Sequence, residues 1–234
     1  MFSFLASILL CWIDNSSDRE TGTEENFEDD SLASISSVAE LGSIFWIISL
    51  LCVTLYGAVL PFNYIASGFL TENYFNNIPK AEAQNKAGLY MSVPFFISAF
   101  MVPIYGMLID NYGQRAYMSL FASICGFICF LMFYFLPPLY GLITLGMTYS
   151  MFASVIWPAI SLVVRKDLVG FAYGVTTSLQ NAGLSLFPII VAGIYSNSKS
   201  YFTTIFFFLI LMLVSILLSF LLIYVNNGHD SNKI

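Results

Sequence analysis

Charged side chains are scarce in this sequence. Lys and Arg together number 8, Asp and Glu 14 and His 1 among 234 residues, so 9% of the chain is charged. Soluble domains usually carry about 25%. With a net charge of −6, the chain lacks the basic surface by which proteins bind nucleic acid, and no nucleic-acid partner is expected.

The long apolar runs contain no Asp, Glu, Lys, Arg or His. An enzyme working at membrane depth would need paired acids, a Ser–His couple or metal ligands there. The one histidine, His229, stands in the C-terminal tail and is expected to be solvated. We therefore predict no enzyme, no catalytic residue, no metal site and no cofactor.

Cysteines are few, and they stand inside apolar stretches. None of Cys11, Cys52, Cys125 and Cys129 lies in a polar loop, so no disulfide framework is predicted. Cys125 and Cys129 are spaced to share a helix face, but no His or acid near them in sequence would complete a metal site. Core packing is the expected role of both.

The sequence is rich in long apolar runs, and 58% of its residues are hydrophobic and 17% aromatic. Runs long enough to cross a bilayer, which takes about 20 residues, cover 43–64, 87–109, 116–136, 139–164, 168–195 and 201–225. Continuous apolar runs exclude the alternating pattern of a barrel, so the spans must be helices. The predicted fold class is an all-α membrane protein with a six-helix bundle over 43–225.

Three shorter segments flank or precede this bundle. Residues 1–13 are apolar without features of a signal peptide, and we interpret them as the end of a preceding membrane helix. Nine of the fourteen acids lie between Asp14 and Glu40, so 14–42 is predicted to be an acidic disordered loop. Six spans put this loop and the tail 226–234 on one side, which a small excess of Arg and Lys assigns to the cytosol.

Polar and small residues follow helical spacing on three of the spans. The stripes are Ser49, Cys52, Tyr56 and Asn63; Gly146, Ser150, Ser154, Trp157 and Ser161; and Gly174, Ser178, Asn181 and Ser185, with Tyr173 and Gln180 on the adjoining face. Such residues can hold helices together, because small side chains allow close approach and amides hydrogen-bond across helices. Polar groups at membrane depth also mark substrate paths. We predict substrate contacts at Tyr56, Asn63, Trp157, Gln180 and Asn181.

The remaining signals concern movement. Five prolines, Pro61, Pro94, Pro103, Pro158 and Pro188, fall within or near the spans, where each removes a backbone hydrogen bond and bends its helix. The turn "GMLIDNYGQR" at 106–115 places an acid, a glycine and a base between two spans. Gly113 supplies the backbone freedom for a short reversal, and Asp110 can pair with Arg115. The turn is predicted to act as a conformational latch.

At this turn the chain resembles the major facilitator superfamily. The inter-helix signature of that family is G-x-x-x-D-R-x-G-R-R, and Gly106, Asp110, Gly113 and Arg115 stand at four of its places. Asn111 and Gln114 depart from it. The stretches 55–75, 146–164 and 170–193, with a W-P pair and an A-Y-G…S-x-Q-N-x-G run, look like helices seven, ten and eleven of the lysosomal dipeptide carriers of the superfamily.

The resemblance implies a twelve-helix carrier working by alternating access, of which 43–225 would be helices seven to twelve and 1–13 the end of helix six. It also implies an N-terminal six-helix half as partner, a lysosomal location, and a glycosylated single-span accessory subunit. Because the spans offer no charged relay, passive uniport is expected of this half. A carrier of sugars, nucleosides or monocarboxylates, or a membrane scaffold that transports nothing, are the alternatives.

Overall fold

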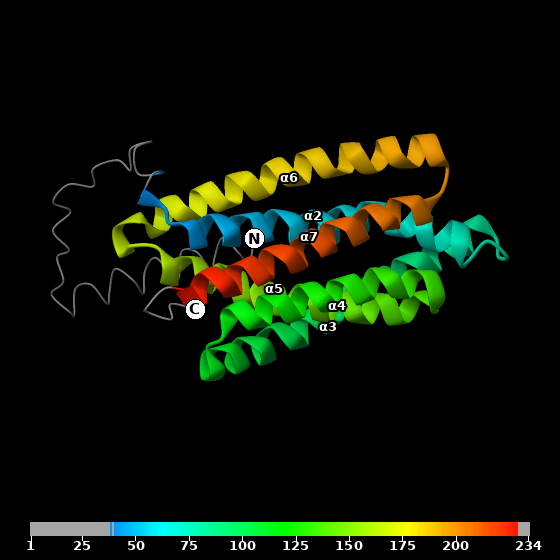
Figure 1. Ribbon diagram of the computed structural model, residues 1–234. Coiled ribbons are helices and arrows are strands. Elements are labelled where there is room, and N and C mark those ends of the chain that lie inside the picture. Colours follow the sequence, from blue (N-terminus) through cyan, green and yellow to red (C-terminus); the bar gives the residue numbers. More distant parts are fainter. Residues whose placement is uncertain (1–37, 39, 229–234) are drawn as a thin grey trace, which may run out of the picture. The chain divides into compact units, whose positions relative to one another are not determined.

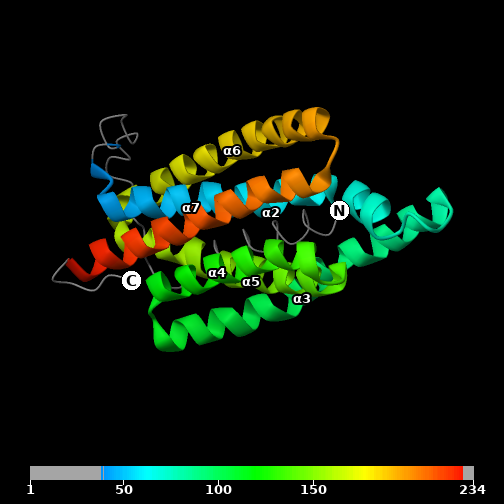
Figure 2. The same cartoon turned by 45° about the vertical axis from the view of Figure 1, so that its right-hand side comes forward.

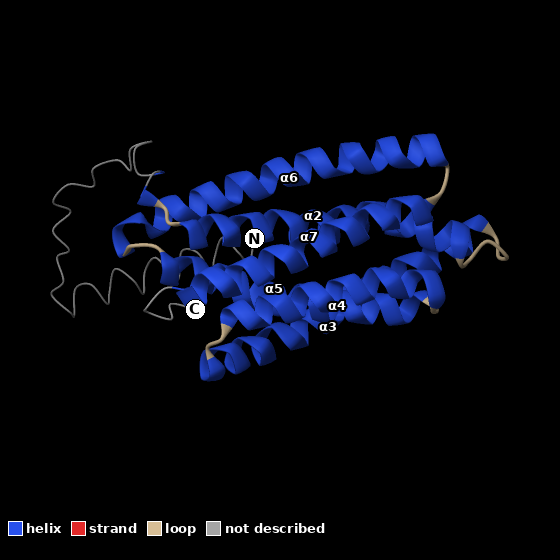
Figure 3. Ribbon diagram, viewed as in Figure 1, coloured by secondary structure: helices blue, strands red, loops and turns tan. Residues whose placement is uncertain are grey.

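The computed structural model describes residue 38 and residues 40–228. The predicted helix end at 1–13, most of the acidic segment 14–42 and tail residues 229–234 lie outside this described part. Within it the chain is helical and has no strand (Figure 3). The helices are α2 (Ser43–Asn73), α3 (Lys80–Tyr112), α4 (Arg115–Phe135), α5 (Pro138–Val163), the 3₁₀ turn η2 (Lys166–Leu168), α6 (Val169–Ser198) and α7 (Tyr201–Gly228).

Six of these helices are long and apolar enough to cross a membrane, which confirms the predicted fold class. They are longer than the predicted spans at several ends. α2 continues nine residues past position 64, α3 begins seven residues before position 87, and α7 continues to Gly228. Alternate helices therefore begin at opposite ends of the bundle: α2, α4 and α6 begin at the end where α3 finishes (Figure 1).

Local chemistry explains where several helices begin and end. α5 begins with Pro138 after Pro137, positions at which proline's fixed φ suits a helix start and its missing N–H leaves no bond unmade. α3 and α4 are separated only by Gly113 and Gln114, both with positive φ, of 71° and 28°. Glycine accepts such a φ without steric cost. All five prolines singled out in the sequence lie inside helices.

The helices differ in how deeply they are buried. α2 is the most buried and α5 follows, whereas α3 and α6 are the least buried. In both views α6 and α3 lie at opposite edges of the bundle, with the other four between them (Figures 1 and 2). α3 packs mainly on α5, and α6 mainly on α2. The faces that α3 and α6 turn away from the bundle are thus not covered by any other described helix.

Aromatic rings fill the centre between α2, α4 and α7. Phe62 of α2 stacks on Phe133 of α4 with ring centroids 5.0 Å apart, and it meets Phe208 of α7 edge-on at 6.1 Å. All three side chains are almost fully buried. Each such ring removes a large apolar area from its surroundings and adds about 0.5–1.5 kcal/mol of ring–ring attraction.

α4 and α7 are apolar nearly all round, a composition typical of outer, lipid-facing helices. Each does expose an apolar face, which includes Phe121 on α4 and Leu217 on α7. Their other faces are buried and contain the serines of both helices. Ser123 of α4 and Ser219 of α7 lie 3.2 Å apart between their oxygens, so this pair joins the two helices.

Candidate functional site

Three aromatic side chains from three helices meet near the end of the bundle at which α2 and α6 begin. Trp157 of α5 donates its indole N–H to the hydroxyl of Tyr56 on α2 at 3.0 Å. Tyr173 of α6 stacks on Trp157 with ring centroids 6.0 Å apart and donates its hydroxyl to the Trp157 carbonyl at 2.8 Å. Two of the predicted substrate contacts, Tyr56 and Trp157, are thus brought together directly.

Tyr56 is also the centre of a wider aromatic cluster. Tyr149 and Phe152 of α5 meet its ring edge-on, at centroid distances of 6.0 and 5.5 Å. Tyr56 is nearly buried, with 5% of its surface exposed, while Trp157 and Tyr173 are half-buried. The cluster can therefore present an aromatic wall, mainly the faces of Trp157 and Tyr173, rather than the Tyr56 ring itself.

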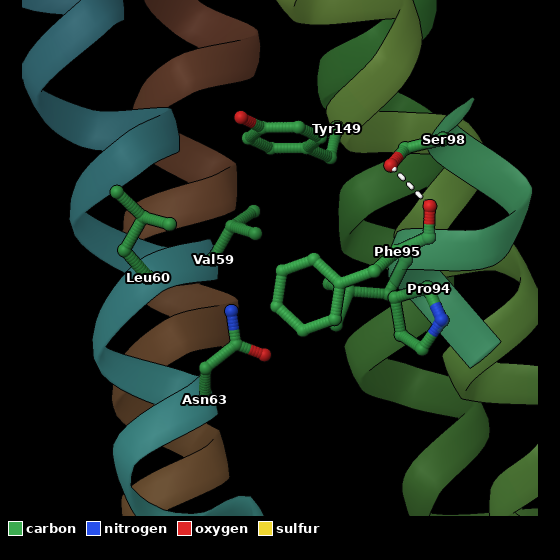
Figure 4. Close-up of a pocket in the computed structure, with 8 residues that line it drawn as sticks. Val59, Leu60, Asn63, Pro94, Phe95, Ser98 and Tyr149 are labelled. Atoms are coloured by element: carbon green, nitrogen blue, oxygen red, sulfur yellow. Dashed lines mark hydrogen bonds between the residues drawn. The ribbon is translucent and has the colours of Figure 1, made fainter. Parts of the chain in front are cut away.

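Asn63 lies two helical turns along α2 from Tyr56 and lines a narrow pocket between α2, α3 and α5 (Figure 4). The lining residues are Val59, Leu60, Asn63, Pro94, Phe95, Ser98, Leu145 and Tyr149. The cavity has a volume of about 40 Å³. This is enough to hold water, since one water molecule needs about 10–15 Å³. Within the described part of the chain, the Asn63 amide has no hydrogen-bond partner.

Tyr149 links the pocket to the aromatic cluster, because it lines the first and contacts Tyr56 in the second. Ser98 faces the same pocket from α3 and donates to the carbonyl of Phe95 at 2.8 Å (Figure 4). Neither Tyr149 nor Ser98 was predicted from the sequence to be a site residue. Tyr149 could have been found from its place two turns before Trp157, and Ser98 from its place one turn after Pro94.

Gln180 and Asn181 lie on α6, away from the aromatic cluster. Gln180 is half-buried, on the same face as Tyr173, and Asn181 is exposed on the open face. Among the residues that the structure describes, neither amide has a hydrogen-bond partner. Of the five predicted residues, the structure therefore joins Tyr56 and Trp157 by a direct hydrogen bond, and the other three contribute amides on α2 and α6.

The three polar stripes have different surroundings. On α5, Gly146 is covered by α3, where an added Cβ would lie 2.8 Å from the Pro94 carbonyl oxygen, and Ser154 donates to the Val102 carbonyl of α3 at 3.2 Å. On α2, Ser49 is buried and bonded to Thr176 of α6 at 3.0 Å. These positions hold helices together, as the packing alternative proposed.

On α6 the situation is reversed. Gly170 and Gly174 have the G-x-x-x-G spacing that often packs one membrane helix against another, but an added Cβ at either glycine meets nothing within 4 Å. Ser178 and Ser185 are exposed and bond only to carbonyls one turn back in their own helix, at 2.8 and 2.9 Å. Within the described part of the chain, the α6 stripe is therefore an open polar face.

In the turn predicted to act as a conformational latch, Arg115 and Asp110 make an ion pair of 3.2 Å across the reversal at Gly113. The arginine is largely buried, with 15% of its side chain exposed, whereas 74% of the aspartate side chain is exposed. The Arg115 Nε is buried without a hydrogen-bond partner in the described part of the chain. Gly106 lies in open space two turns before Gly113.

A second charged group lies at the same end of the bundle. Arg165, in the loop between α5 and α6, pairs with Glu40 at 2.9 Å and with Asp167. The hydrogen bond to Asp167, with the charges of Asp167 and Glu40, raises the pKa of Arg165 above its usual value. This end of the bundle therefore carries two arginine–carboxylate groups. One is in the turn between α3 and α4, and the other is centred on the loop between α5 and α6. Among the described residues, no three His, Cys, Asp or Glu side chains are grouped closely enough to hold a metal.

Comparison with known proteins places this geometry in a family. The model of the Major Facilitator Superfamily matches residues 1–188 and 43–234. The human lysosomal dipeptide transporter MFSD1 is 30% identical over 234 residues, which is 99% of this chain and 49% of the relative. Its chicken counterpart is 29% identical over 99% of this chain and 52% of the relative, and the zebrafish one 28% over 97% and 49%.

This chain therefore spans about half the length of the curated relatives it matches. The matched regions include the six described helices and the turn with the Asp110–Arg115 pair. Together, the family match, the six membrane-spanning helices and the relatives establish a multi-pass membrane protein of a transporter family. The chain belongs to the major facilitator superfamily.

Proposed function

We propose that this chain is the C-terminal six-helix half of a lysosomal carrier that moves dipeptides by alternating access, as a uniporter. The relatives named as lysosomal dipeptide transporters support the substrate and the location. The partners in this proposal are an N-terminal six-helix half, the lipid bilayer and a glycosylated single-span accessory subunit.

One observation carries the proposal of a solute path: three amides in the spans, Asn63, Gln180 and Asn181, are unsatisfied within the described part of the chain. Leaving a buried polar group unpaired costs about 1–3 kcal/mol, and lipid offers no partner. Such groups persist where they face water or a polar ligand. All three belong to helices that surround the pocket or flank the aromatic cluster.

The chain's own residues suggest what each part of the site does. Amide groups donate and accept hydrogen bonds without charge, and they suit the peptide group of a dipeptide. The faces of Trp157 and Tyr173 suit an apolar side chain. The pocket at Asn63, with about 40 Å³ open to water, is far below the 300–1,000 Å³ of ligand sites. A surface outside this pocket must complete the binding site.

Uniport is proposed because the predicted spans contain no titratable acid or histidine. Proton coupling through a membrane uses chains of Asp, Glu or His at depth. The described helices place Glu72, Glu82 and Asp110 near their ends, outside those spans. This half therefore offers binding groups and no relay.

The site is tested by uptake of tritiated alanylalanine into liposomes that contain the full-length protein. Replacing both amides, Gln180→Ala with Asn181→Ala, is expected to lower uptake about tenfold, since two hydrogen bonds worth about 0.5–1.5 kcal/mol each are lost. The matched control is Asn197→Ala, an exposed amide near the end of the same helix. Wild-type uptake by the double variant would show that these amides do not bind substrate.

The same assay separates the alternatives. Uptake of labelled glucose, uridine or lactate in place of the dipeptide would keep a carrier and change its substrate. No uptake of any of them by folded protein would favour the scaffold that transports nothing.

The Asp110–Arg115 pair is proposed to stabilise the state that is closed at its end of the bundle. Asp110→Asn removes the charge while keeping the shape, and a partly exposed ion pair is worth about 0–1 kcal/mol. We expect up to about a fivefold shift in the populations of the two states, measured by spin-label distances across that end. Asp167→Asn, which alters the other ion-pair group, is the control. Equal populations in Asp110→Asn and wild type would contradict the latch.

A further inference from the structure

A second and larger pocket lies at the opposite end of the bundle, between the end of α2 and the start of α3. Its volume is about 500 Å³, within the range of sites for small molecules. The lining residues are Ser67, Gly68, Thr71, Glu72, Phe75, Asn76, Ile78, Lys80, Ala83 and Gln84. None of them was among the predicted site residues.

Two opposite charges line this pocket without neutralising each other. The described part of the chain contains no ion pair of Glu72 or of Lys80. Among the described residues, the polar contacts of the Glu72 carboxylate are two long ones, to the Tyr195 hydroxyl at 3.3 and 3.5 Å. Lys86, by contrast, is engaged, because its ammonium lies over the Phe75 ring at 4.9 Å. In the described part of the chain, the pocket thus contains an anion and a cation that are in no ion pair.

The helix ends reinforce this separation of charge. α2 ends at Asn73 beside Glu72, and a helix C-terminus carries a partial negative charge that favours a cation. α3 begins at Lys80 after Pro79, which supplies no side-chain cap. The first N–H groups of α3 favour an anion, and Glu82 of the chain itself stands in this first turn. The two walls match a small molecule with an ammonium at one end and a carboxylate at the other.

The pocket also contains a buried polar group that lacks a partner. The Thr71 hydroxyl is buried and makes no hydrogen bond in the described part of the chain. It stands on α2 between the charged residue Glu72 and the polar residue Ser67. A hydroxyl in this place can bond to the peptide group of a molecule whose two ends are held by the charges.

α2 connects this pocket to the pocket in the membrane. Asn63 lines the narrow pocket between α2, α3 and α5, here called the inner pocket. Ser67 and Thr71 line the larger pocket between the end of α2 and the start of α3, here called the outer pocket. These three residues are four apart, so they lie along one side of the helix. Asn63, Ser67 and Thr71 thus form a polar stripe along α2 that runs from the outer pocket toward the inner one.

We propose that the outer pocket is an entry site that captures the zwitterionic form of a dipeptide, with Glu72 binding the ammonium and Lys80 the carboxylate. The proposal rests on the proposed function. The site supplies, at the membrane surface, the charged contacts that the spans of this half lack. Because it precedes the transport step, it governs the concentration at which the carrier is half-saturated more than the maximal rate.

The test uses the full-length protein in liposomes of phosphatidylcholine alone, with tritiated alanylalanine as the probe. Glu72→Gln and Lys80→Gln are each expected to raise KM about threefold to fivefold, as the loss of one partly exposed charge contact does, with the maximal rate within a factor of two. Glu82→Gln and Lys199→Gln, on exposed residues that do not line the pocket, are expected to leave KM unchanged.

Competition by blocked peptides assigns each charge to one end of the substrate. N-acetyl-alanylalanine, which has no ammonium, is expected to compete poorly with labelled alanylalanine for the wild-type protein. Its affinity for the Glu72→Gln variant is expected to be no lower than its affinity for wild type. Alanylalanine amide, which has no carboxylate, is expected to do the same with Lys80→Gln. If both blocked peptides lose affinity in both variants as alanylalanine does, the assignment is wrong.

Other outcomes separate this proposal from the proposed function. Dipeptide uptake with an unchanged KM in both variants would overturn the entry site and leave the carrier in place. No dipeptide uptake by wild-type protein would overturn both. A phosphatidylethanolamine headgroup has the same ammonium–anion chemistry. If adding that lipid changes the wild-type KM, and this change disappears in Glu72→Gln, the pocket holds lipid and the proposal fails.

Discussion

The small and polar residues of α5 and α6 follow similar helical spacing but have different surroundings. On α5, Gly146 lies against Pro94 of α3, and Ser154 donates to a carbonyl of α3. On α6, Gly174 has open space around it, and Ser178 bonds only within its own helix. Spacing determines which residues share a face, but tertiary packing determines whether a neighbour covers that face. The same pattern can therefore hold helices together or leave polar groups free for a ligand.

Other hydroxyls of the bundle form pairs that cross between helices. The Ser49–Thr176, Thr54–Ser215 and Ser123–Ser219 pairs lie 2.8 to 3.2 Å apart. Each pair satisfies polar groups that lipid could not. Variants on the covered faces should therefore alter stability, and variants on the open face of α6 should alter transport.

The largest expected effect comes from adding one methyl group to a covered glycine. In Gly146→Ala the new Cβ would lie 2.8 Å from the Pro94 carbonyl oxygen and 3.0 Å from its Cα. Backbone atoms cannot rotate away, so α3 and α5 must separate, at a cost of about 1–3 kcal/mol. We expect a lower Tm for the purified chain in detergent, measured by thermal unfolding.

Gly174→Ala makes the same chemical change on the open stripe and serves as the control. Nothing within 4 Å meets its Cβ, and alanine is favoured over glycine within a helix by up to about 1 kcal/mol. Its Tm should be unchanged or higher. If both variants lost the same stability, the α6 face would be covered and the comparison between α5 and α6 would be wrong.

Hydropathy alone predicted the six helices, since long apolar runs in a bilayer have few alternatives. It did not predict where they end. α2 has 31 residues, about 46 Å at 1.5 Å per residue, which exceeds the bilayer core of about 30 Å. Its last turns contain Glu72 and Asn73 and continue the helix into the polar region. The outer pocket was overlooked because the apolar span had been ended at position 64.

Two residues of the aromatic cluster could be chosen from the sequence. Tyr56 and Trp157 were chosen as polar residues on helical stripes, and their direct hydrogen bond confirms that they lie together. Their role toward a substrate stays a prediction. Tyr149 and Ser98 were overlooked because a contact between α2, α3 and α5 depends on how the helices cross, and spacing within one helix carries no information about crossing.

The smallest expected effect comes from one hydroxyl on a covered face. The Ser215 hydroxyl is fully buried and donates to Thr54 Oγ1 on α2 at 2.8 Å. Hydrogen bonds between membrane helices average only about 0.6 kcal/mol, because the unfolded chain in a membrane also finds partners. Ser215→Ala should therefore lower the free energy of unfolding by about 0.6 kcal/mol, measured by denaturant titration in detergent.

Ser185→Ala removes the same hydroxyl from the open face of α6. Ser185 is exposed and donates to the Asn181 carbonyl of its own helix at 2.9 Å, a carbonyl that the helix backbone already bonds. No hydrogen bond between helices is lost, so the free energy of unfolding should stay within error of the wild-type value. Both changes remove one serine hydroxyl from a helix. The difference between their effects on the free energy of unfolding therefore measures the contribution of the hydrogen bond to the neighbouring helix. Equal losses would mean that the hydroxyls act through their own helices, and that the crossing pairs do not hold the bundle together.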